Sequence, residues 1–412
     1  MKIVVVVGAG LADEPIADLD GKTPLDRART PHLDHIASRG IFGLTRTIER
    51  GASVDRDAGL LAVLGYGPAE NAGAGVLEAI GLGVALGPDD VAFRCDLVGL
   101  ETSAEGRVVL RDPAATLADP DMGRTLAADL APGVAGAGLT LHPGLGHRHV
   151  LVWRGGDDRV RTTAPYAMVG KPIDGSLPDG PGADVLRALI DGSQALLAGH
   201  PICRALREQG GAAPGAFWPW GGGRRPSLKA VARLGVVGAI VAVAPHAIGA
   251  GVLAGLAHVP PAGAAGTLET DLRATVEQGL RALDRHDLVV IHVEGPNTAA
   301  LLGDAQRKVG AIERLDEEVV GPVLEGLRQR GGAWRLLVTS DHAAPSATRA
   351  PSSEPVPFAV YVSDDDQKTR GVDRGFSERD ARDQGIFIAE AHGLLERVCR
   401  RAEPAAAPAR DV

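Results

Sequence analysis

Residues 2–15 read KIVVVVGAGLADEP, a run of β-branched residues that leads into two glycines and an acidic turn. The unbroken apolar run predicts a strand buried on both faces. A strand followed by Gly-Ala-Gly is also how a dinucleotide-binding loop begins, but that loop needs a third glycine and a helix that starts inside it. Here the third glycine position holds Asp13, and two prolines follow within eleven residues. The context therefore argues against a dinucleotide site.

Similar β-branched runs recur along the chain, and amphipathic helical stretches alternate with them. The runs lie at residues 149–154, 238–244, 287–294, 335–340 and 357–363. The longest helical stretch, residues 304–331, places its apolar residues close to one face. Buried strands separated by helices predict an α/β fold with a mostly parallel sheet flanked by helices.

A change in the sequence pattern between residues 101 and 171 predicts a smaller inserted α+β domain. This segment holds short, more polar strand candidates such as GRVVLRD and HRHVLVWRG. The core domain would then be discontinuous, formed by residues 1–100 and 172–400. The Pro- and Ala-rich end of the chain, residues 401–412, is predicted to be a flexible tail.

Composition excludes several classes of partner. The formal net charge is −9, with 43 Lys and Arg against 52 Asp and Glu, which argues against nucleic-acid and anionic-membrane binding. Three cysteines form no CxxC pair, as expected in a reducing compartment. No apolar run reaches the roughly 18 residues that span a bilayer. We expect a cytoplasmic protein, and the sequence leaves association into homo-oligomers open.

A series of motifs covers nearly the whole chain in a fixed order. They include GKTPLDRARTPHLDHIASRGIFGL, LGYGPAE, FRCDLVGLE, FWPWGGGRRPSL, DLVVIHVEGPN and TSDHAAPS. Together they resemble the archaeal-type, cofactor-independent phosphoglycerate mutases of the alkaline phosphatase superfamily. The bacterial branch of that family is also labelled homoserine kinase. The resemblance implies an alkaline-phosphatase-like core, and phosphoryl transfer through a serine or threonine with two metal ions.

Most of the metal site that this resemblance implies is missing. The family pattern LDG[LM][AG]D reads GAGLAD here, and the nucleophile motif reads DRDAGLLAVLGYGP. The family patterns HVEAPDEAGH and THxxDPVPF read HVEGPNTAAL and APSSEPVPF. The positions of the lost groups are occupied by Ala9, Arg56, Asn297, Leu301 and Pro351. A catalytic metal site needs at least three protein ligands, and too few remain here. We therefore expect no metal and no other cofactor.

Two members of the implied site remain, Asp341 and His342. Arg56 is predicted to lie beside Asp341, where its charge would replace the missing cation. The alternative to a catalytic role is that Arg56 and Asp341 form a purely structural ion pair. His342 is a candidate general acid or base, or a hydrogen-bonded remnant. Asp13 and Asp57 adjoin lost groups and are candidates for recruitment.

Five further residues match the family's contacts to substrate phosphate and carboxylate groups. They are Arg94 and Asp96 in FRCDLV, Arg148 in HRHVLVWR, and Arg224 and Arg225 in GGGRRP. Arginine suits bidentate binding of these anions, although surface arginines are common. The predicted partner is a small phosphorylated or carboxylated metabolite.

Three functions stay open on this basis. The first is a repurposed enzyme that works on such a metabolite without a metal, through His342, Asp341 and Arg56. The second is a non-catalytic pseudoenzyme or scaffold, in which Leu301 and Pro351 would fill the old cleft. The third is an active, metal-dependent phosphoglycerate mutase or related phosphotransferase. A persisting cleft with convergent polar groups would favour the first over the second.

Overall fold

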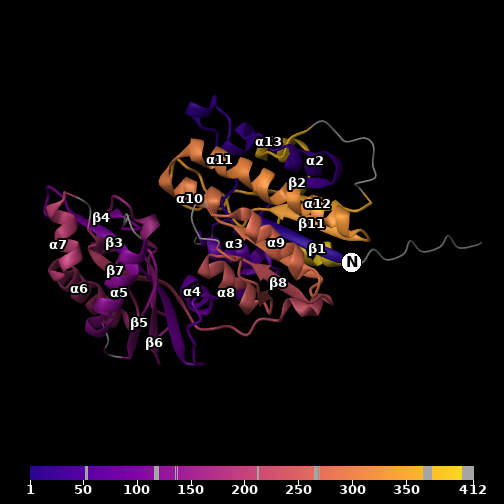
Figure 1. Ribbon diagram of the computed structural model, residues 1–412. Coiled ribbons are helices and arrows are strands. Elements are labelled where there is room, and N and C mark those ends of the chain that lie inside the picture. The colour runs from indigo at the N-terminus through magenta and orange to yellow at the C-terminus, as the bar shows by residue number, and fades with distance from the viewer. Residues whose placement is uncertain are drawn as a thin grey trace, which may run out of the picture.

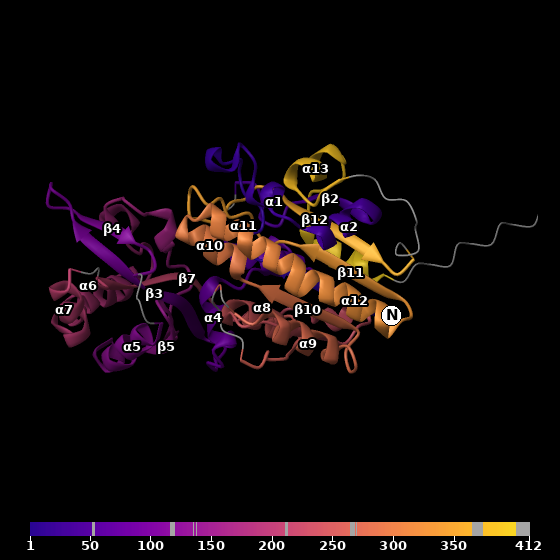
Figure 2. The same cartoon turned by 45° about the horizontal axis from the view of Figure 1, so that its top comes forward.

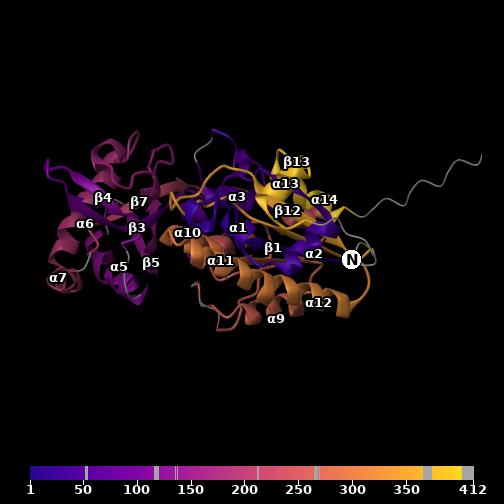
Figure 3. The same cartoon turned by 90° about the horizontal axis from the view of Figure 1, so that it is seen from above.

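A computed structural model shows two lobes, each built around its own sheet (Figure 1). It describes residues 1–51, 54–115, 120–134, 136, 138–210, 213–263, 268, 270–364 and 374–400. Seen from above, the lobe that contains β3 lies to one side of the lobe that contains β1 (Figure 3). The C-terminal tail predicted at 401–412 lies outside the described residues.

The larger lobe contains a mostly parallel sheet of eight strands in the order β13-β2-β12-β11-β1-β10-β8-β9. In chain order these strands are β1 (Lys2–Gly8), β2 (Ile41–Thr45), β8 (Gly238–Val241), β9 (Ala257–His258), β10 (Leu288–Val293), β11 (Trp334–Thr339), β12 (Val356–Val362) and β13 (Phe387–Ile388). Only β12 runs antiparallel to its neighbours. The predicted α/β class with a mostly parallel sheet is confirmed.

The valine run of β1 forms the centre of this sheet, and its side chains alternate between two hydrophobic cores. Ile3, Val5 and Val7 face one core, and Val4 and Val6 face the other. The first core is covered by α3 (Arg56–Val63), α4 (Ala74–Gly81), α8 (Pro245–Leu253) and α14 (Leu394–Cys399). The second is covered by α2 (Pro31–Arg39), α9 (Leu272–Ala282), α11 (Ala305–Arg314) and α12 (Gly321–Arg330) (Figure 2). Burial on both faces explains why the run shows no alternation.

The loop after β1 is not a dinucleotide-binding turn. Gly10 adopts a left-handed φ of 62°, and the next helical residues are the short 3-10 turn Ala17–Leu19. Asp13 is a structural residue here. Its carboxylate accepts from Lys308 Nζ at 2.9 Å, and that fully buried ammonium also donates to the carbonyls of Ala12 and Ala344. The ion pair ties this loop to α11, and Lys308 also holds the segment after β11 through Ala344, so recruitment of Asp13 to chemistry is not supported.

The smaller lobe is an antiparallel sheet covered by helices, and it is larger than the sequence predicted. Its strands are β3 (Asp90–Thr102), β4 (Val108–Asp112), β5 (Leu139–Leu145), β6 (Arg148–Arg154) and β7 (Ala216–Gly223). Its helices are α5 (Pro120–Val134), α6 (Ala183–Gly199) and α7 (Pro201–Glu208). The predicted boundaries at 101 and 171 are therefore wrong, because β3 begins at Asp90 and β7 ends at Gly223. The apolar start of β3 is typical of a core strand, and the glycines and proline of AFWPWGGG conceal β7.

Three short helices complete the larger lobe: α1 (Pro24–Arg27), α10 (Gly295–Leu302) and α13 (Glu378–Asp383). Within the part of the chain that the structure describes, no helix is long and apolar enough to cross a membrane.

Candidate active site

A group of buried and half-buried polar and charged side chains lies where the carboxyl ends of the parallel strands meet the smaller lobe. We call it the interlobe cluster. Its members are Arg56, Asp57, Glu78, Arg94, Asp96, Arg148, His246 and Glu294. The larger lobe contributes the first turns of α3 and α8, the middle of α4 and the residue after β10, and the smaller lobe contributes β3 and β6. Ligand sites of α/β proteins gather at this edge of a parallel sheet.

Arg148 joins the two lobes within this cluster. Its NH2 group donates to Glu78 Oε2 at 2.8 Å and to His246 Nδ1 at 2.9 Å. Burial alone would raise the pKa of Glu78, but Arg148, Arg94 and His246 together outweigh burial and lower that pKa to about 2. Because a guanidinium can only donate, Nδ1 of His246 must be an acceptor and Nε2 carries the ring proton of the neutral imidazole. Burial, with Arg56 nearby, lowers the pKa of His246 to about 3 and keeps it neutral.

Glu294 lies on the other side of His246. Its Oε1 is 2.9 Å from His246 Nε2, yet neither atom has a well-aligned hydrogen-bond partner. Its Oε2 lies 3.8 Å from Arg56 NH1. Burial opposes ionisation, but His246 and Arg56 hold the pKa of Glu294 well below its usual range. The cluster therefore keeps an ionised carboxylate beside a neutral imidazole.

Asp57 is a member of the cluster whose carboxyl group accepts no hydrogen bond. Its side chain is 1% exposed, and neither carboxyl oxygen has a hydrogen-bond partner. The nearest cations are Arg56 Nε at 3.6 Å and, if it were protonated, His246 Nε2 at 3.9 Å. The N-cap of α3, Asp55, accepts from the Asp57 backbone N–H and fixes the turn. Burial, together with the charge of Asp55, raises the pKa of Asp57 to about 7.

Arg94 and Asp96 form a tight pair on β3. Arg94 Nε donates to Asp96 Oδ1 at 2.9 Å, and Trp220 Nε1 donates to Asp96 Oδ2 at 2.8 Å. The guanidinium of Arg94 also lies over the Trp220 ring, 5.0 Å from its centroid. The structure therefore brings together three of the predicted substrate-binding residues, Arg94, Asp96 and Arg148.

The remaining two predicted anion contacts lie elsewhere. Arg224 donates to the carbonyl of Gly156 and pairs with Asp158 at 3.3 Å, so it anchors a turn of the smaller lobe. Arg225 is exposed. Neither has a contact with the interlobe cluster among the described residues.

The remnant of the implied metal site forms a second, adjoining network. Asp341 Oδ1 accepts from the Gly10 N–H at 3.1 Å and lies 2.8 Å from His342 Nδ1. Its Oδ2 lies 3.4 Å from His292 Nε2. Burial opposes ionisation of Asp341, but His342 and His292 hold its pKa below the ordinary value. Gly59 of α3 packs directly against this turn, because a Cβ there would lie 2.0 Å from the Asp341 carbonyl oxygen.

Asn297 links this remnant to the interlobe cluster. Its amide Nδ2 donates to Glu294 Oε2 at 3.2 Å, and its Oδ1 lies 3.1 Å from His342 Nε2. The predicted Arg56–Asp341 pair is wrong, because Arg56 lies against Asp57 and Glu294 instead. The histidines beside Asp341 supply the partners that Arg56 was expected to provide.

The residues present do not fit the two-metal centre that the family implies. Three described side chains, His246, His292 and Glu294, could bring ligand atoms within 4.8 Å of one another. However, Arg148 donates to His246 Nδ1, so the Nε2 lone pair is not free for a cation. Arg56 already places a positive charge against Glu294. The positive charges of Arg148 beside His246 and of Arg56 beside Glu294 therefore disfavour binding of a divalent cation.

Leu301 and Pro351 do not fill the old cleft, contrary to what the scaffold hypothesis expected. Leu301 is 43% exposed on α10, and Pro351 is partly exposed. Of the two α10 residues at lost metal-site positions, Asn297 and Leu301, it is Asn297 that points inward, where its amide contacts Glu294 and His342.

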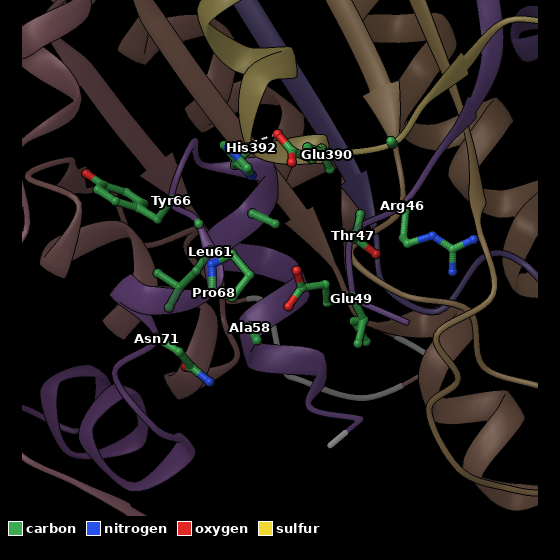
Figure 4. A pocket seen from close by; sticks show the side chains of 15 residues that line it. Arg46, Thr47, Glu49, Ala58, Leu61, Tyr66, Pro68, Asn71, Glu390 and His392 are labelled. Carbon is green, nitrogen blue, oxygen red and sulfur yellow. Dashed lines mark ion pairs between the residues drawn. The ribbon is translucent and has the colours of Figure 1, made fainter. Parts of the chain in front are cut away.

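A separate cavity of about 270 Å³ lies beside α3 (Figure 4). Ala58, Leu61 and Pro68 line it from one side, and Glu390 and His392 from the other. No member of the interlobe cluster lines this cavity. The candidate site is thus the enclosed cluster rather than this hollow.

Comparison with known proteins decides the family. The family model described as 2,3-bisphosphoglycerate-independent phosphoglycerate mutase matches residues 37–203. The probable 2,3-bisphosphoglycerate-independent phosphoglycerate mutase of Geobacter sulfurreducens is 37% identical over 97% of this chain and 100% of its own length. The corresponding mutase of Methanothrix thermoacetophila is 36% identical over 96% of this chain and 98% of its own. The chain belongs to this mutase family.

Solved structures agree with the fold of a family mutase. The PH0037 protein from Pyrococcus horikoshii has a TM-score of 0.75 at 24% identity, over 98% of this chain and 99% of that one. The cofactor-independent phosphoglycerate mutase from Thermoplasma acidophilum has a TM-score of 0.56 at 23% identity, over 97% and 99%. The sequence relatives confirm the predicted family, and these two structures agree with its fold.

Two members of the site were missed by the sequence reasoning. Glu78 is a lone acid in the apolar helix AGVLEAIG, and His246 is a lone histidine in the apolar stretch APHAIGAG. A single ionisable residue inside an apolar helix was the available signal, since such a residue needs a buried partner.

Proposed function

We propose that this mutase-family protein has lost metal-dependent phosphoryl transfer and acts, without a metal, on a small phosphorylated or carboxylated metabolite at the interlobe cluster. Arg56 stands where the resemblance places the nucleophile, and a guanidinium accepts no phosphoryl group. None of the eight cluster residues has a hydroxyl or thiol that could replace it. Phosphorylated three-carbon acids such as phosphoglycerate are the ligand class that the family membership favours.

The observation that carries this proposal is where the unpartnered polar atoms gather. Among the described residues, eight buried side-chain nitrogen and oxygen atoms lack a hydrogen-bond partner. Five of them belong to Asp57, Arg148, His246 and Glu294. Of these five, His246 Nε2 and Glu294 Oε1 lie 2.9 Å from each other in a poorly aligned contact, whereas the two Asp57 oxygens and Arg148 Nε have no contact that close. Buried polar groups are normally satisfied, so such a concentration points to a ligand or water that completes the site. A site kept only for stability would satisfy these groups internally.

The cluster can perform acid–base and electrostatic chemistry. Three guanidiniums, from Arg56, Arg94 and Arg148, can stabilise negative charge in a water-poor setting. Asp57, with a pKa of about 7, can gain or lose a proton near neutral pH. His342 and Asp341, which the sequence predicted to be catalytic, adjoin this centre through Asn297, and in this proposal they support it.

A second candidate function is non-catalytic binding of the same metabolite. The observation in its favour is that Arg94 and Arg148 already have carboxylate partners at 2.9 and 2.8 Å. Such pairing limits what these arginines can offer a ligand. Turnover of the bound metabolite distinguishes the two functions.

Binding of 3-phosphoglycerate in the presence of excess EDTA tests the proposal. Calorimetry should show saturable binding, and the melting temperature should rise, since a ligand at 100 times its Kd adds roughly 2.7 kcal/mol. Arg56→Gln should weaken binding by roughly tenfold or more, through loss of a charged hydrogen bond. Arg111→Gln, which removes a highly exposed arginine of β4, is the matched control and should bind normally. Failure to bind, or binding that appears only when Mn²⁺ is added, would contradict the proposal.

A further inference from the structure

Asp57 is a buried carboxyl group for which the fold supplies no hydrogen-bond partner. Each of the other three carboxylates in the cluster has a guanidinium or ring nitrogen within 2.9 Å, whereas the nearest cation to Asp57 is Arg56 Nε at 3.6 Å and neither Asp57 oxygen accepts a hydrogen bond. Arg148 Nε is also buried without a partner. The two unpartnered groups lie on either side of the His246 ring, whose Nδ1 meets Arg148 and whose Nε2 faces Asp57 at 3.9 Å. A donor and an acceptor are thus left without hydrogen-bond partners on the two sides of one imidazole ring.

Charged groups face Asp57 from every element around it. They are Asp55 and Arg56 at the start of α3, Arg94 on β3, Arg148 on β6 and His246 on α8, and the titratable Tyr166 also lies near. Glu78 on α4 and Glu294 after β10 are paired with these groups. Burial and Asp55 disfavour the ionised form, and the three arginines only partly offset them, which leaves the pKa of Asp57 at about 7. Near neutral pH this carboxyl is therefore poised between its acceptor form and its donor form.

We propose that Asp57 binds the metabolite as a neutral carboxylic acid, donating its proton to an anionic oxygen that Arg56 and Arg148 hold. This inference rests on the proposed function, because it requires an anion in the cluster. An incoming phosphate or carboxylate oxygen repels an ionised Asp57 and accepts from a protonated one. Binding above neutral pH then takes up one proton from solvent onto Asp57, and no covalent bond forms or breaks. The protonated Asp57 carboxyl thus gives the anionic oxygen of the ligand one more hydrogen-bond donor.

Proton uptake on binding is the direct test. The heat of 3-phosphoglycerate binding at pH 8 should differ between Tris and HEPES buffers, which have different ionisation enthalpies, by an amount that corresponds to nearly one proton. Affinity should fall roughly tenfold for each pH unit between pH 7.5 and 9. In Asp57→Asn the amide still donates, so binding should persist with no proton uptake and a flat pH profile. Asp57→Ala should bind more weakly by roughly tenfold or more.

Each outcome separates this inference from the proposed function. The exposed residue Asp191 of α6 provides a matched control, and Asp191→Asn should behave like the wild-type protein. If 3-phosphoglycerate gives no binding heat in either buffer, the proposed function fails. If it binds without proton uptake, or if uptake persists in Asp57→Asn because the ligand itself is protonated, the role of Asp57 alone is overturned.

Discussion

Asp57→Asn is expected to make the protein more stable, by about 4 kcal/mol at pH 8. The pKa of Asp57 is raised from 3.8 to about 7, so the folded state opposes its ionisation. A raised pKa means that the folded state binds more protons than the unfolded state between these values. Stability is therefore retained below about pH 4 and lost as the pH rises towards 7. Asparagine cannot ionise, so the substitution removes that penalty.

The pH dependence of this gain distinguishes it from a general stabilisation. From the same linkage, the advantage of Asp57→Asn should shrink to about 2 kcal/mol at pH 5. Urea unfolding of the wild-type protein, Asp57→Asn and the control Asp191→Asn at both pH values measures it. A destabilised Asp57→Asn, or a gain that does not change with pH, would show that the fold does not oppose ionisation of Asp57. Loss of stability at a functional residue is a common trade-off.

Glu78→Gln is expected to destabilise the protein by about 3 kcal/mol at pH 7. Glu78 is the carboxylate that pairs with Arg148 at 2.8 Å, and its side chain is 1% exposed. Its pKa is lowered from 4.5 to about 2, so the pair contributes fully above pH 4.5, and its contribution is lost as the pH falls towards 2. Removing one member of a buried pair leaves the other charge uncompensated, which costs about 3–5 kcal/mol.

The same urea unfolding experiment measures this loss. Glu208→Gln, which changes an exposed glutamate at the end of α7, is the control and should have almost no effect. The difference between wild type and Glu78→Gln should diminish below pH 4. An effect below about 0.5 kcal/mol would mean that Arg148 does not depend on Glu78, and that the pair between the lobes is not structural.

The sequence predicted the fold well where local pattern and tertiary burial agree. The valine run of β1 and the helical repeat around Ile312 are such cases, because each apolar face in the sequence is buried as expected. The family followed from ordered motifs, and comparison confirmed it. The boundaries of the smaller lobe were missed because β3 resembles a core strand and the glycines of β7 do not resemble a strand.

The site was predicted only in part, because contacts between distant segments decide it. The sequence indicated Arg56, Arg94 and Arg148, but it could not show that Arg56 meets Glu294 instead of Asp341. It also could not show that His246, 98 residues from Arg148 in the chain, would accept from it. That both carboxyl oxygens of Asp57 lack hydrogen-bond partners became visible only in the folded structure.

The most direct test of the central claim combines metal analysis with a mutase assay on the purified protein. The claim is that Arg56, Arg148 and the neutral His246 leave no room for divalent cations in this site. After incubation with Mn²⁺, Zn²⁺ or Co²⁺ and removal of the free ion, the protein should retain far less than one equivalent. It should not interconvert 2-phosphoglycerate and 3-phosphoglycerate, with or without these ions. Stoichiometric retention of metal together with phosphoglycerate mutase activity would contradict the account.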